Sequence, residues 1–329
     1  MRASSQTHPA GPFNVPGTFH LKAAVAFGVL AFWALHQALG GLRWDHIAGG
    51  AVFLGLFYGE KRTQPLFEFA LPLILMLAVY DLQSYFAGAL RPAEVHLEAP
   101  YKFDLAFFGI ATPEGAQIPS QWLQRHTHPF LDFVTGLAYI NFVPVFLLVA
   151  AWFRFGLARW DRHRDGDFLR RNVRALMWGM LILNIACCSV YYLYPAAPPW
   201  YIDRYGFELL TDVPPDPAGG ARFDALTGSA VYAAYYSRTP NVFGAVPSIH
   251  AAFPLLTLYF AFRLKSLRGF SVFFFLLINF SALYLNHHFV FDLIAGWIMA
   301  LGVAFLVDRV ANSPAFSKDI RIPAFQRGS

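Results

Sequence analysis

The chain has 329 residues, of which 57% are hydrophobic and only 14% are charged. This composition excludes an ordinary soluble domain, because one water-soluble core cannot bury so many long apolar runs. The formal net charge of +5 does not indicate a nucleic-acid partner, since arginines cluster in short loops between apolar segments, where membrane topology explains them. The sequence therefore predicts an all-α, multi-pass membrane protein.

Apolar runs of about 20 residues, the length that crosses a bilayer, define the expected helices, and shorter runs are accepted as buried or tilted ones. The expected helices, in chain order, cover residues 21–40, 46–58, 66–86, 129–153, 174–195, 249–263, 269–286 and 289–308. About six to eight of them are expected to cross the membrane. The sequence thus predicts one transmembrane domain over 21–309, with a catalytic core over about 174–309, a retained leader at 1–20 and a tail at 310–329.

Two arginine-rich connections predict the orientation in the membrane. The segment Arg154–Arg174 and the tight turn Arg263–Arg268 are both cytoplasmic by the positive-inside rule. Alternation then places both termini in the cytoplasm and the connections 87–128, 196–248 and 286–288 on the exoplasmic (periplasmic or luminal) face. The two long connections mix aromatic residues, prolines and charges, so we expect structured loops that fold over the bundle.

The residues suited to chemistry lie at the expected outer ends of the last helices. His288 and Asp292 are four residues apart, so on a helix they share a face and the carboxylate can orient the imidazole. An aspartate inside an apolar helix is costly unless paired, which makes it a candidate for function. His250 follows Ser248, a predicted N-cap at a helix end that favours a bound phosphate.

Two facing histidines, one oriented by a carboxylate and one beside an anion site, are the minimum for phosphoryl transfer through a phosphohistidine. Pro-Ser-x-His and His-x-x-x-Asp are each short patterns that also arise as a capped helix or a buried polar contact. Their order, their separation by one hairpin and their shared membrane face favour the catalytic interpretation.

Three segments resemble a known family: YPAAPPWY (Tyr194–Tyr201), VPSIHAAFP (Val246–Pro254) and YLNHHFVFDLIAGW (Tyr284–Trp297). They resemble the type-2 phosphatidic acid phosphatase superfamily and, within it, most of all the inositol phosphorylceramide synthase branch of inositolphosphotransferases. The resemblance extends over most of residues 66–308 and implies that family's helical core. It also implies His288 as nucleophile, Asp292 as its orienting group, His250 as acid for the departing lipid alcohol, and chemistry without metal or cofactor.

The chain departs from the hydrolase pattern of this superfamily. The hydrolase has a lysine and an Arg-Pro pair in its first block, and Tyr194–Tyr201 contains no cation. In the third block of the hydrolase pattern an arginine follows a serine. Here Ser281 matches that serine, and the next residue is Ala282. A phosphodiester needs fewer cations than a monoester dianion, so we expect a phosphodiester donor. The resemblance implies that the reaction transfers a phospho-polyol such as phosphoinositol from a phospholipid to a ceramide-like lipid alcohol.

Further residues are candidates for substrate binding, and each has a plainer interpretation. The candidates are Ser248, His287, Tyr201, Arg238, Lys102 and Asp81, with Arg204 as another loop cation. The cations are equally typical of solvated or interfacial loop residues, and a buried aspartate is also a structural partner.

Other functions remain open at this point. A lipid phosphate or polyprenyl pyrophosphate phosphatase is the main alternative, and a transporter or silent scaffold is disfavoured by the missing inverted repeats. His250, His288 and Asp292 include zinc-ligand types, but the chain has no short-spaced His/Cys set. Cys187 and Cys188 are adjacent in an apolar run and are interpreted as packing residues. The sequence identifies no protein partner.

Overall fold

The computed structural model describes residues 16–86, 94–161, 163–210, 212–239 and 241–313, so the first 15 residues and the tail from 314 lie outside the described residues. The chain forms two compact units, whose boundary between Ile74 and Leu75 falls inside a helix. The single domain expected over 21–309 stays a prediction.

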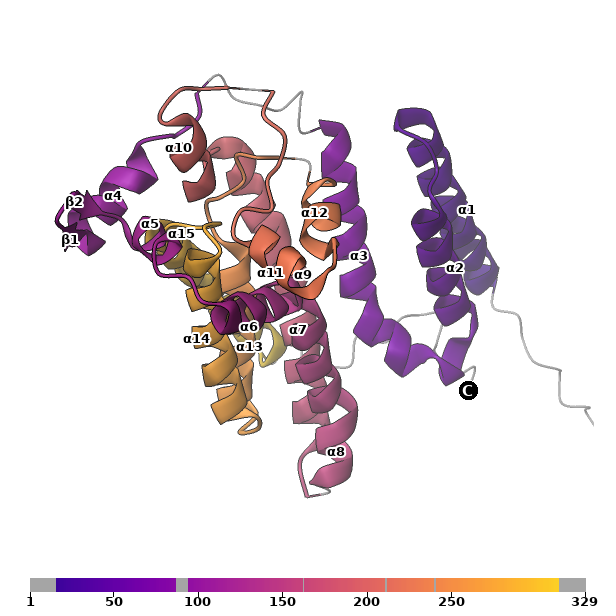
Figure 1. Cartoon of the computed structure of the whole chain (residues 1–329). Coiled ribbons are helices and arrows are strands. Elements are labelled where there is room, and N and C mark those ends of the chain that lie inside the picture. The colour runs from indigo at the N-terminus through magenta and orange to yellow at the C-terminus, as the bar shows by residue number, and fades with distance from the viewer. Residues whose placement is uncertain (1–15, 87–93, 162, 211, 240, 314–329) are drawn as a thin grey trace, which may run out of the picture. The chain divides into compact units, whose positions relative to one another are not determined.

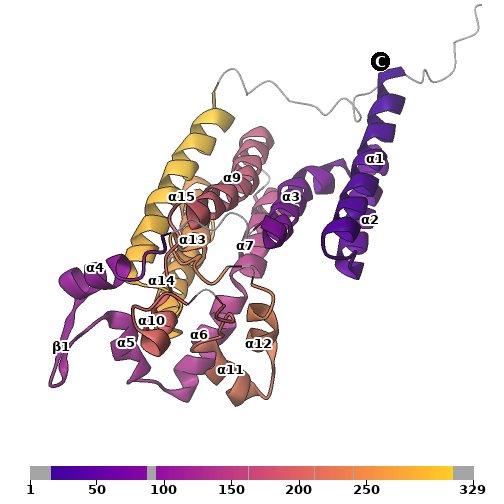
Figure 2. The ribbon, with the colours of Figure 1, turned by 90° about the horizontal axis from the view of Figure 1, so that it is seen from above.

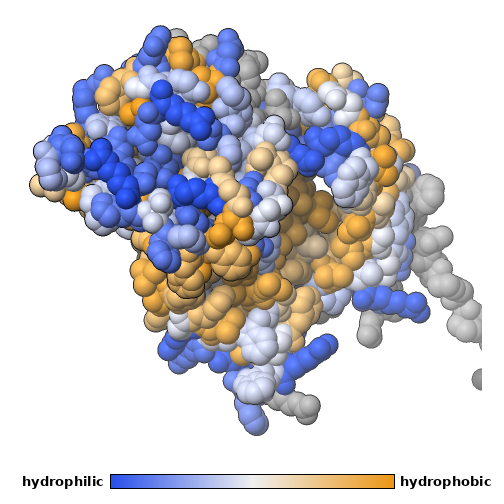
Figure 3. All heavy atoms as spheres, in the orientation of Figure 1, coloured by the Kyte–Doolittle hydropathy of each residue, from blue (hydrophilic) through white to orange (hydrophobic). Residues whose placement is uncertain are grey.

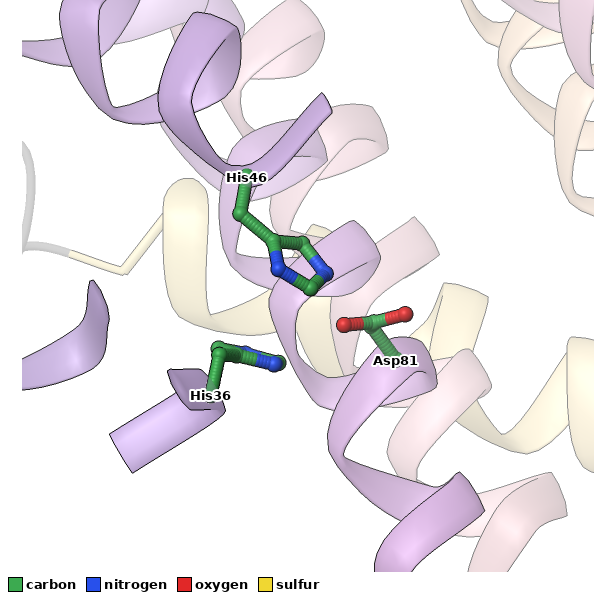
Figure 4. Close-up of side chains that lie close together, drawn as sticks. All are labelled: His36, His46 and Asp81. Carbon is green, nitrogen blue, oxygen red and sulfur yellow. The ribbon is translucent and has the colours of Figure 1, made fainter. Parts of the chain in front are cut away.

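The first unit contains three packed helical segments. They are α1 (Pro16–Leu39), α2 (Trp44–Tyr58) with the short helix η1 (Glu60–Arg62), and the beginning of α3 (Gln64–Phe86). Phe57 and Phe67 form the centre of its small apolar core. At the other end of the α1–α2 pair, the imidazoles of His36 and His46 lie against each other with ring centroids 3.9 Å apart (Figure 4).

The second unit is a helical bundle whose connections form further short elements. In chain order its elements are the end of α3, α4 (Ala99–Phe108), β1 (Ile110–Thr112), β2 (Gly115–Gln117), α5 (Pro119–Gln124), α6 (Pro129–Ile140), α7 (Phe142–Ala151), the π-helical η2 (Trp152–Gly156), α8 (Leu157–Trp160), α9 (Gly166–Leu193), α10 (Pro199–Tyr205), α11 (Gly220–Thr227), α12 (Val231–Tyr236), α13 (Ile249–Arg263), α14 (Arg268–Tyr284) and α15 (Val290–Ala311). Helix α13 is central and packs against α7, α9, α14 and α15 (Figures 1 and 2).

All eight ranges expected to be helical are helical in the structure. The prediction of one continuous helix over 129–153 is wrong. This range is divided into α6 and α7, which meet at an angle of 59°. Asn141 leaves the helical conformation there, and its side-chain amide donates to the carbonyl of Leu137 at 2.8 Å. Pro144 follows in the first turn of α7, where it has no N–H to donate to the carbonyl of Ile140, so the hydrogen-bond ladder cannot continue.

The membrane prediction is confirmed, with fewer full-length spans than expected. Four described helices are long and apolar enough to cross a bilayer, and the bent α6–α7 pair makes a fifth if it counts as one span. Helices α13 and α14, with 15 and 17 residues, are shorter. Helix α14 has exposed apolar side chains such as Phe273 and Leu276. In Figure 3 the surface around α14 is mostly orange and lies below the hydrophilic surface of α4 and α10.

The two long connections fold over one end of the bundle, as expected. Backbone bridges join His96 to Ala196 and Ala196 to Gly244, so segments far apart in the sequence lie side by side. Two apolar clusters form beneath the connections, and α15 begins between them: Phe289 belongs to one cluster and Leu293 to the other. Burying an apolar side chain of this size stabilises the folded state by about 1.5–3 kcal/mol. The burial of Phe289 and Leu293 therefore fixes the segment around His288.

Candidate active site

His288 and Asp292 lie at the start of α15, as their spacing predicts. Asn286 has a positive φ of 63°, a conformation that asparagine adopts readily after a helix end, and it terminates α14 just before the histidines. Nδ1 of His288 is 3.1 Å from Oδ2 of Asp292, and the N–H of Phe289 donates to the same oxygen at 2.9 Å. The carboxylate is completely buried, and because it holds Nδ1, it leaves Nε2 of His288 without this contact.

His250 approaches this pair from the first turn of α13. The hydroxyl of Ser248 caps that helix by accepting from the N–H of Ala251 at 3.3 Å, which confirms the predicted N-cap. The ring centroids of His250 and His288 are 5.7 Å apart. The fold therefore brings together His250, His288 and Asp292, together with a helix end that attracts anions.

The beginnings of α13 and α15 are joined directly through the backbone. The N–H of Ser248 donates to the carbonyl of Asp292 at 2.9 Å. One turn further along α15, Gly296 faces the carbonyl of Ser248 so closely that a Cβ would lie less than 3.0 Å from that oxygen. The spacing between the two histidines thus depends on a glycine that the sequence analysis did not identify.

Aromatic rings hold the histidines in a stack. Tyr139 stacks on His250 with centroids 3.9 Å apart, and His287 lies between Tyr139 at 5.3 Å and Tyr236 at 4.6 Å. Burial, reinforced by the neighbouring His288, lowers the pKa of His287 to about 3. His287 is therefore neutral at physiological pH and does not supply positive charge to a phosphate.

Asp104, on α4, is a further residue that the sequence analysis missed. Its buried carboxylate accepts from the N–H groups of Val290 at 2.8 Å and Phe291 at 2.9 Å. These are the first two N–H groups of α15, which have no partner within the helix. Burial raises the pKa of Asp104 to about 6 although both bonds favour the charged form. The connection 87–128 thereby fixes the helix that holds the His288–Asp292 pair.

A second buried network supports the site from α6 and α11. The guanidinium of Arg222 donates to Asp132 at 2.6 Å and to Gln124 at 2.8 Å, and the hydroxyl of Tyr284 donates to Asp132 at 3.0 Å. These bonds connect four helices beneath His287, so Arg222 acts as a structural cation.

The histidines face a cavity of about 140 Å³. His250, His287 and His288 line it together with Gln83, Asn184 and other side chains of α3, α9, α12 and the following loop. Among the described residues of its wall, none is a lysine or an arginine, and the acidic Asp216 is paired with Arg204. The cavity wall is therefore largely neutral outside the histidines.

Most of the other predicted binding residues lie away from this cavity in the described structure. Lys102 is exposed and paired with Glu98 on α4, and Arg238 is exposed beyond α12. Tyr201 is fully buried, with its hydroxyl donating to the carbonyl of Glu208 at 2.7 Å. Asp81 lies on α3 outside the cavity lining. Of the six, only His287 lines the cavity and only Ser248 adjoins His250, and all six binding assignments stay predictions.

The chain was compared with known proteins. The family described as "PAP2 superfamily" matches residues 116–306. A phosphoinositol dihydroceramide synthase of Bacteroides thetaiotaomicron is 31% identical over 275 residues, which cover 82% of this chain and 86% of that protein. Two inositol phosphorylceramide synthase catalytic subunits, of Saccharomyces cerevisiae and Schizosaccharomyces pombe, are 29% and 30% identical over 75% and 64% of this chain. The chain spans only 58% and 45% of these fungal proteins. No solved structure matches it significantly.

Proposed function

From the premise that the chain belongs to the PAP2 superfamily, we propose that it transfers a phospho-polyol head group from a phospholipid to a ceramide-like lipid alcohol. The observation that supports this most is the cavity itself, which joins His250 and His288 but has no lysine or arginine among its described lining residues. The printed names of the relatives, a phosphoinositol dihydroceramide synthase and inositol phosphorylceramide synthases, agree with the proposal.

In the first half of the proposed reaction, Nε2 of His288 attacks the phosphorus of the donor. A P–N bond forms, the P–O bond to the diacylglycerol oxygen breaks, and His250 gives its proton to that oxygen. Asp292 stabilises the imidazolium that develops on His288, through the bond to Nδ1. The free N–H groups of the first turn of α13 are suited to bind a non-bridging phosphate oxygen.

In the second half, the hydroxyl of the lipid alcohol enters where the diacylglycerol has left. His250 now takes the hydroxyl proton, the oxygen attacks phosphorus, and the P–N bond to His288 breaks. The products are a head-group-bearing lipid and one diacylglycerol per turnover. Charge favours this route over hydrolysis of a lipid phosphate, because a phosphodiester has one negative charge and the monoester substrate of a phosphatase has nearly two.

We further propose that the site faces the exoplasmic side. The arginine-rich segment Arg154–Arg174 covers the residues before α9 and the first turns of this helix. The cavity lies near the opposite end of α9. The turn between α13 and α14 is likewise at the end of α13 that is remote from His250. Both basic connections are thus separated from the catalytic histidines by the length of a helix, as the positive-inside rule requires of an exoplasmic site.

The test uses purified full-length protein with phosphatidylinositol and a ceramide. We expect equal amounts of diacylglycerol and inositol-phosphate-bearing ceramide, with little free phosphate. His288→Ala abolishes both products, and His126→Ala, which replaces a histidine outside the cavity lining, leaves them unchanged. Release of inorganic phosphate from phosphatidic acid or a polyprenyl pyrophosphate, with no transfer to any lipid alcohol, would instead assign the protein as a phosphatase.

A further inference from the structure

One wall of the cavity has polar side chains that the proposed chemistry does not use. Gln83 on α3 and Asn184 and Cys188 on α9 all line it. They form a hydrogen-bonded series: the amide of Gln83 donates to Sγ of Cys188 at 2.9 Å, and that thiol is 3.8 Å from Oδ1 of Asn184. Asn184 is only 3% exposed and Cys188 only 6%. We call these three residues the neutral wall.

The neutral wall extends from the histidines toward the middle of a membrane span. Asn184, Cys188 and Tyr191 are spaced i, i+4 and i+7, which places them on one face of α9. The hydroxyl of Tyr191 donates to the carbonyl of Pro247 at 3.0 Å, so Tyr191 is level with the turn that precedes His250. At 1.5 Å per residue, Cys188 lies about 4–5 Å and Asn184 about 10 Å further along the helix.

The chemistry of the neutral wall favours an uncharged polar ligand over a phosphate. Carboxamide and thiol groups both donate and accept hydrogen bonds and have no charge to balance an anion. Polar groups at this depth are costly unless they face a cavity or a partner, and these face the cavity beside the reacting groups. Their ligand therefore has neutral donors and acceptors and lies on the membrane side of the phosphorus.

We propose that Gln83, Asn184 and Cys188 form the acceptor subsite, which recognises the amide and secondary hydroxyl of a ceramide-like lipid next to its reacting primary hydroxyl. This proposal rests on the proposed function and adds the residues by which the enzyme selects its lipid-alcohol acceptor. The polyol head group is bonded to phosphorus and lies toward the connections, whereas the acyl chains of an acceptor must extend into the bilayer along α9. A diacylglycerol also presents a primary hydroxyl, but its esters only accept hydrogen bonds, so the neutral wall discriminates against it.

The decisive experiment compares acceptors and donors separately. In Asn184→Leu and Gln83→Leu, we expect KM for ceramide to rise about tenfold or more, because each loses a buried hydrogen-bonding partner. KM for phosphatidylinositol and the single-turnover release of diacylglycerol without acceptor should remain unchanged. The preference for ceramide over 1,2-dioleoylglycerol as acceptor should shrink by a similar factor. Asn172→Leu is the matched control, since Asn172 is a fully buried asparagine of the same helix outside the cavity lining.

Binding of a fluorescent short-chain ceramide to the full-length protein gives a second readout that needs no turnover. Weaker binding to Asn184→Leu and Gln83→Leu than to wild type and Asn172→Leu supports the acceptor subsite even if the transferase assay fails. An equal rise in KM for donor and acceptor would show that the neutral wall contacts the donor. Unchanged acceptor KM and ceramide binding in both variants would also overturn the proposal. Cys188→Ala shows whether the thiol contributes beyond joining the two amides.

Discussion

Replacing Gly296 by alanine tests whether the contact between α13 and α15 sets the catalytic geometry. The added Cβ would lie less than 3.0 Å from the carbonyl oxygen and 3.3 Å from the carbonyl carbon of Ser248. Ordinary contacts between carbon and a carbonyl oxygen are about 3.3–3.6 Å. The two backbones must therefore separate by about 0.9 Å to reach such a contact, because neither the methyl group nor the carbonyl can rotate away.

This separation acts on the catalytic residues directly. The hydrogen bond from the N–H of Ser248 to the carbonyl of Asp292, now 2.9 Å, would lengthen to about 3.8 Å, beyond the usual range. Overpacking of this kind costs about 1–3 kcal/mol of folding stability. A displacement of about 1 Å in an active site costs about 100-fold in rate, so this separation predicts a loss of nearly 100-fold in transfer activity.

Gly302→Ala is the matched control for this prediction. Gly302 lies on the same helix, and a Cβ there meets no other atom within 4 Å. Both variants replace a helical glycine by a better helix former, so their difference isolates the contact with Ser248. The assay is transfer of the head group to ceramide, with thermal unfolding in detergent measured in parallel. Full activity and stability in Gly296→Ala would refute the idea that this contact holds the two histidines in register.

Three further predictions follow from the site. Asp104→Asn should lower kcat for transfer about tenfold and change the KM for ceramide little, because a neutral amide caps α15 less well than a carboxylate. The measurement compares kcat and KM of this variant with those of the wild type, and an unchanged kcat would contradict the prediction. The pKa of Asp104 is raised from 3.8 to about 6 in the folded protein. Between about pH 4 and 6 the native state therefore binds a proton at Asp104 that the unfolded state has lost. Its stability should therefore fall as pH rises from about 4 to about 6, and the thermal midpoint of Asp104→Asn should show less of this fall. EDTA should leave activity unchanged because a ring nitrogen of His288 attacks phosphorus itself; a loss that zinc restores would contradict this. Asp292→Asn should retain more activity than His288→Ala, since it keeps the shape of the orienting group but loses its charge; equal inactivity of the two would show that the charge is indispensable.

Local sequence patterns were sufficient for the helices and for the contact between His288 and Asp292. The helices follow from apolar runs, and the His288–Asp292 contact follows from a four-residue spacing on one helix. The approach of His250 was also predictable, because a single hairpin places the beginnings of α13 and α15 at the same end of the bundle. The break at Asn141 was missed although Pro144 gives a local signal for it.

The interactions between distant segments could not be predicted in the same way. Asp104 contacts Val290 across 186 positions of the chain, and no periodicity relates α4 to the beginning of α15. The contact of Cys188 with Gln83 was not predictable either, because it joins positions 105 residues apart, and a buried thiol in an apolar run is typical of packing. The pairing of the loop cations was not predictable either: Lys102 pairs with Glu98, and Arg204 pairs with Asp216 of the cavity lining.

The scarcity of fixed positive charge in the cavity has a consequence for the order of events. His287 is neutral, and the described wall offers no lysine or arginine, so the positive charge near a phosphate is limited to the proton that His250 gives and the imidazolium that forms on His288. In the proposed mechanism the charge on His288 develops only as its nitrogen attacks phosphorus, so stabilisation increases in the transition state more than in the bound donor. A monoester dianion brings one more negative charge into the same neutral cavity, with no fixed cation to balance it. Selection of a phosphodiester is then an electrostatic property of the wall, whereas selection of the lipid alcohol depends on the hydrogen bonds of Gln83 and Asn184.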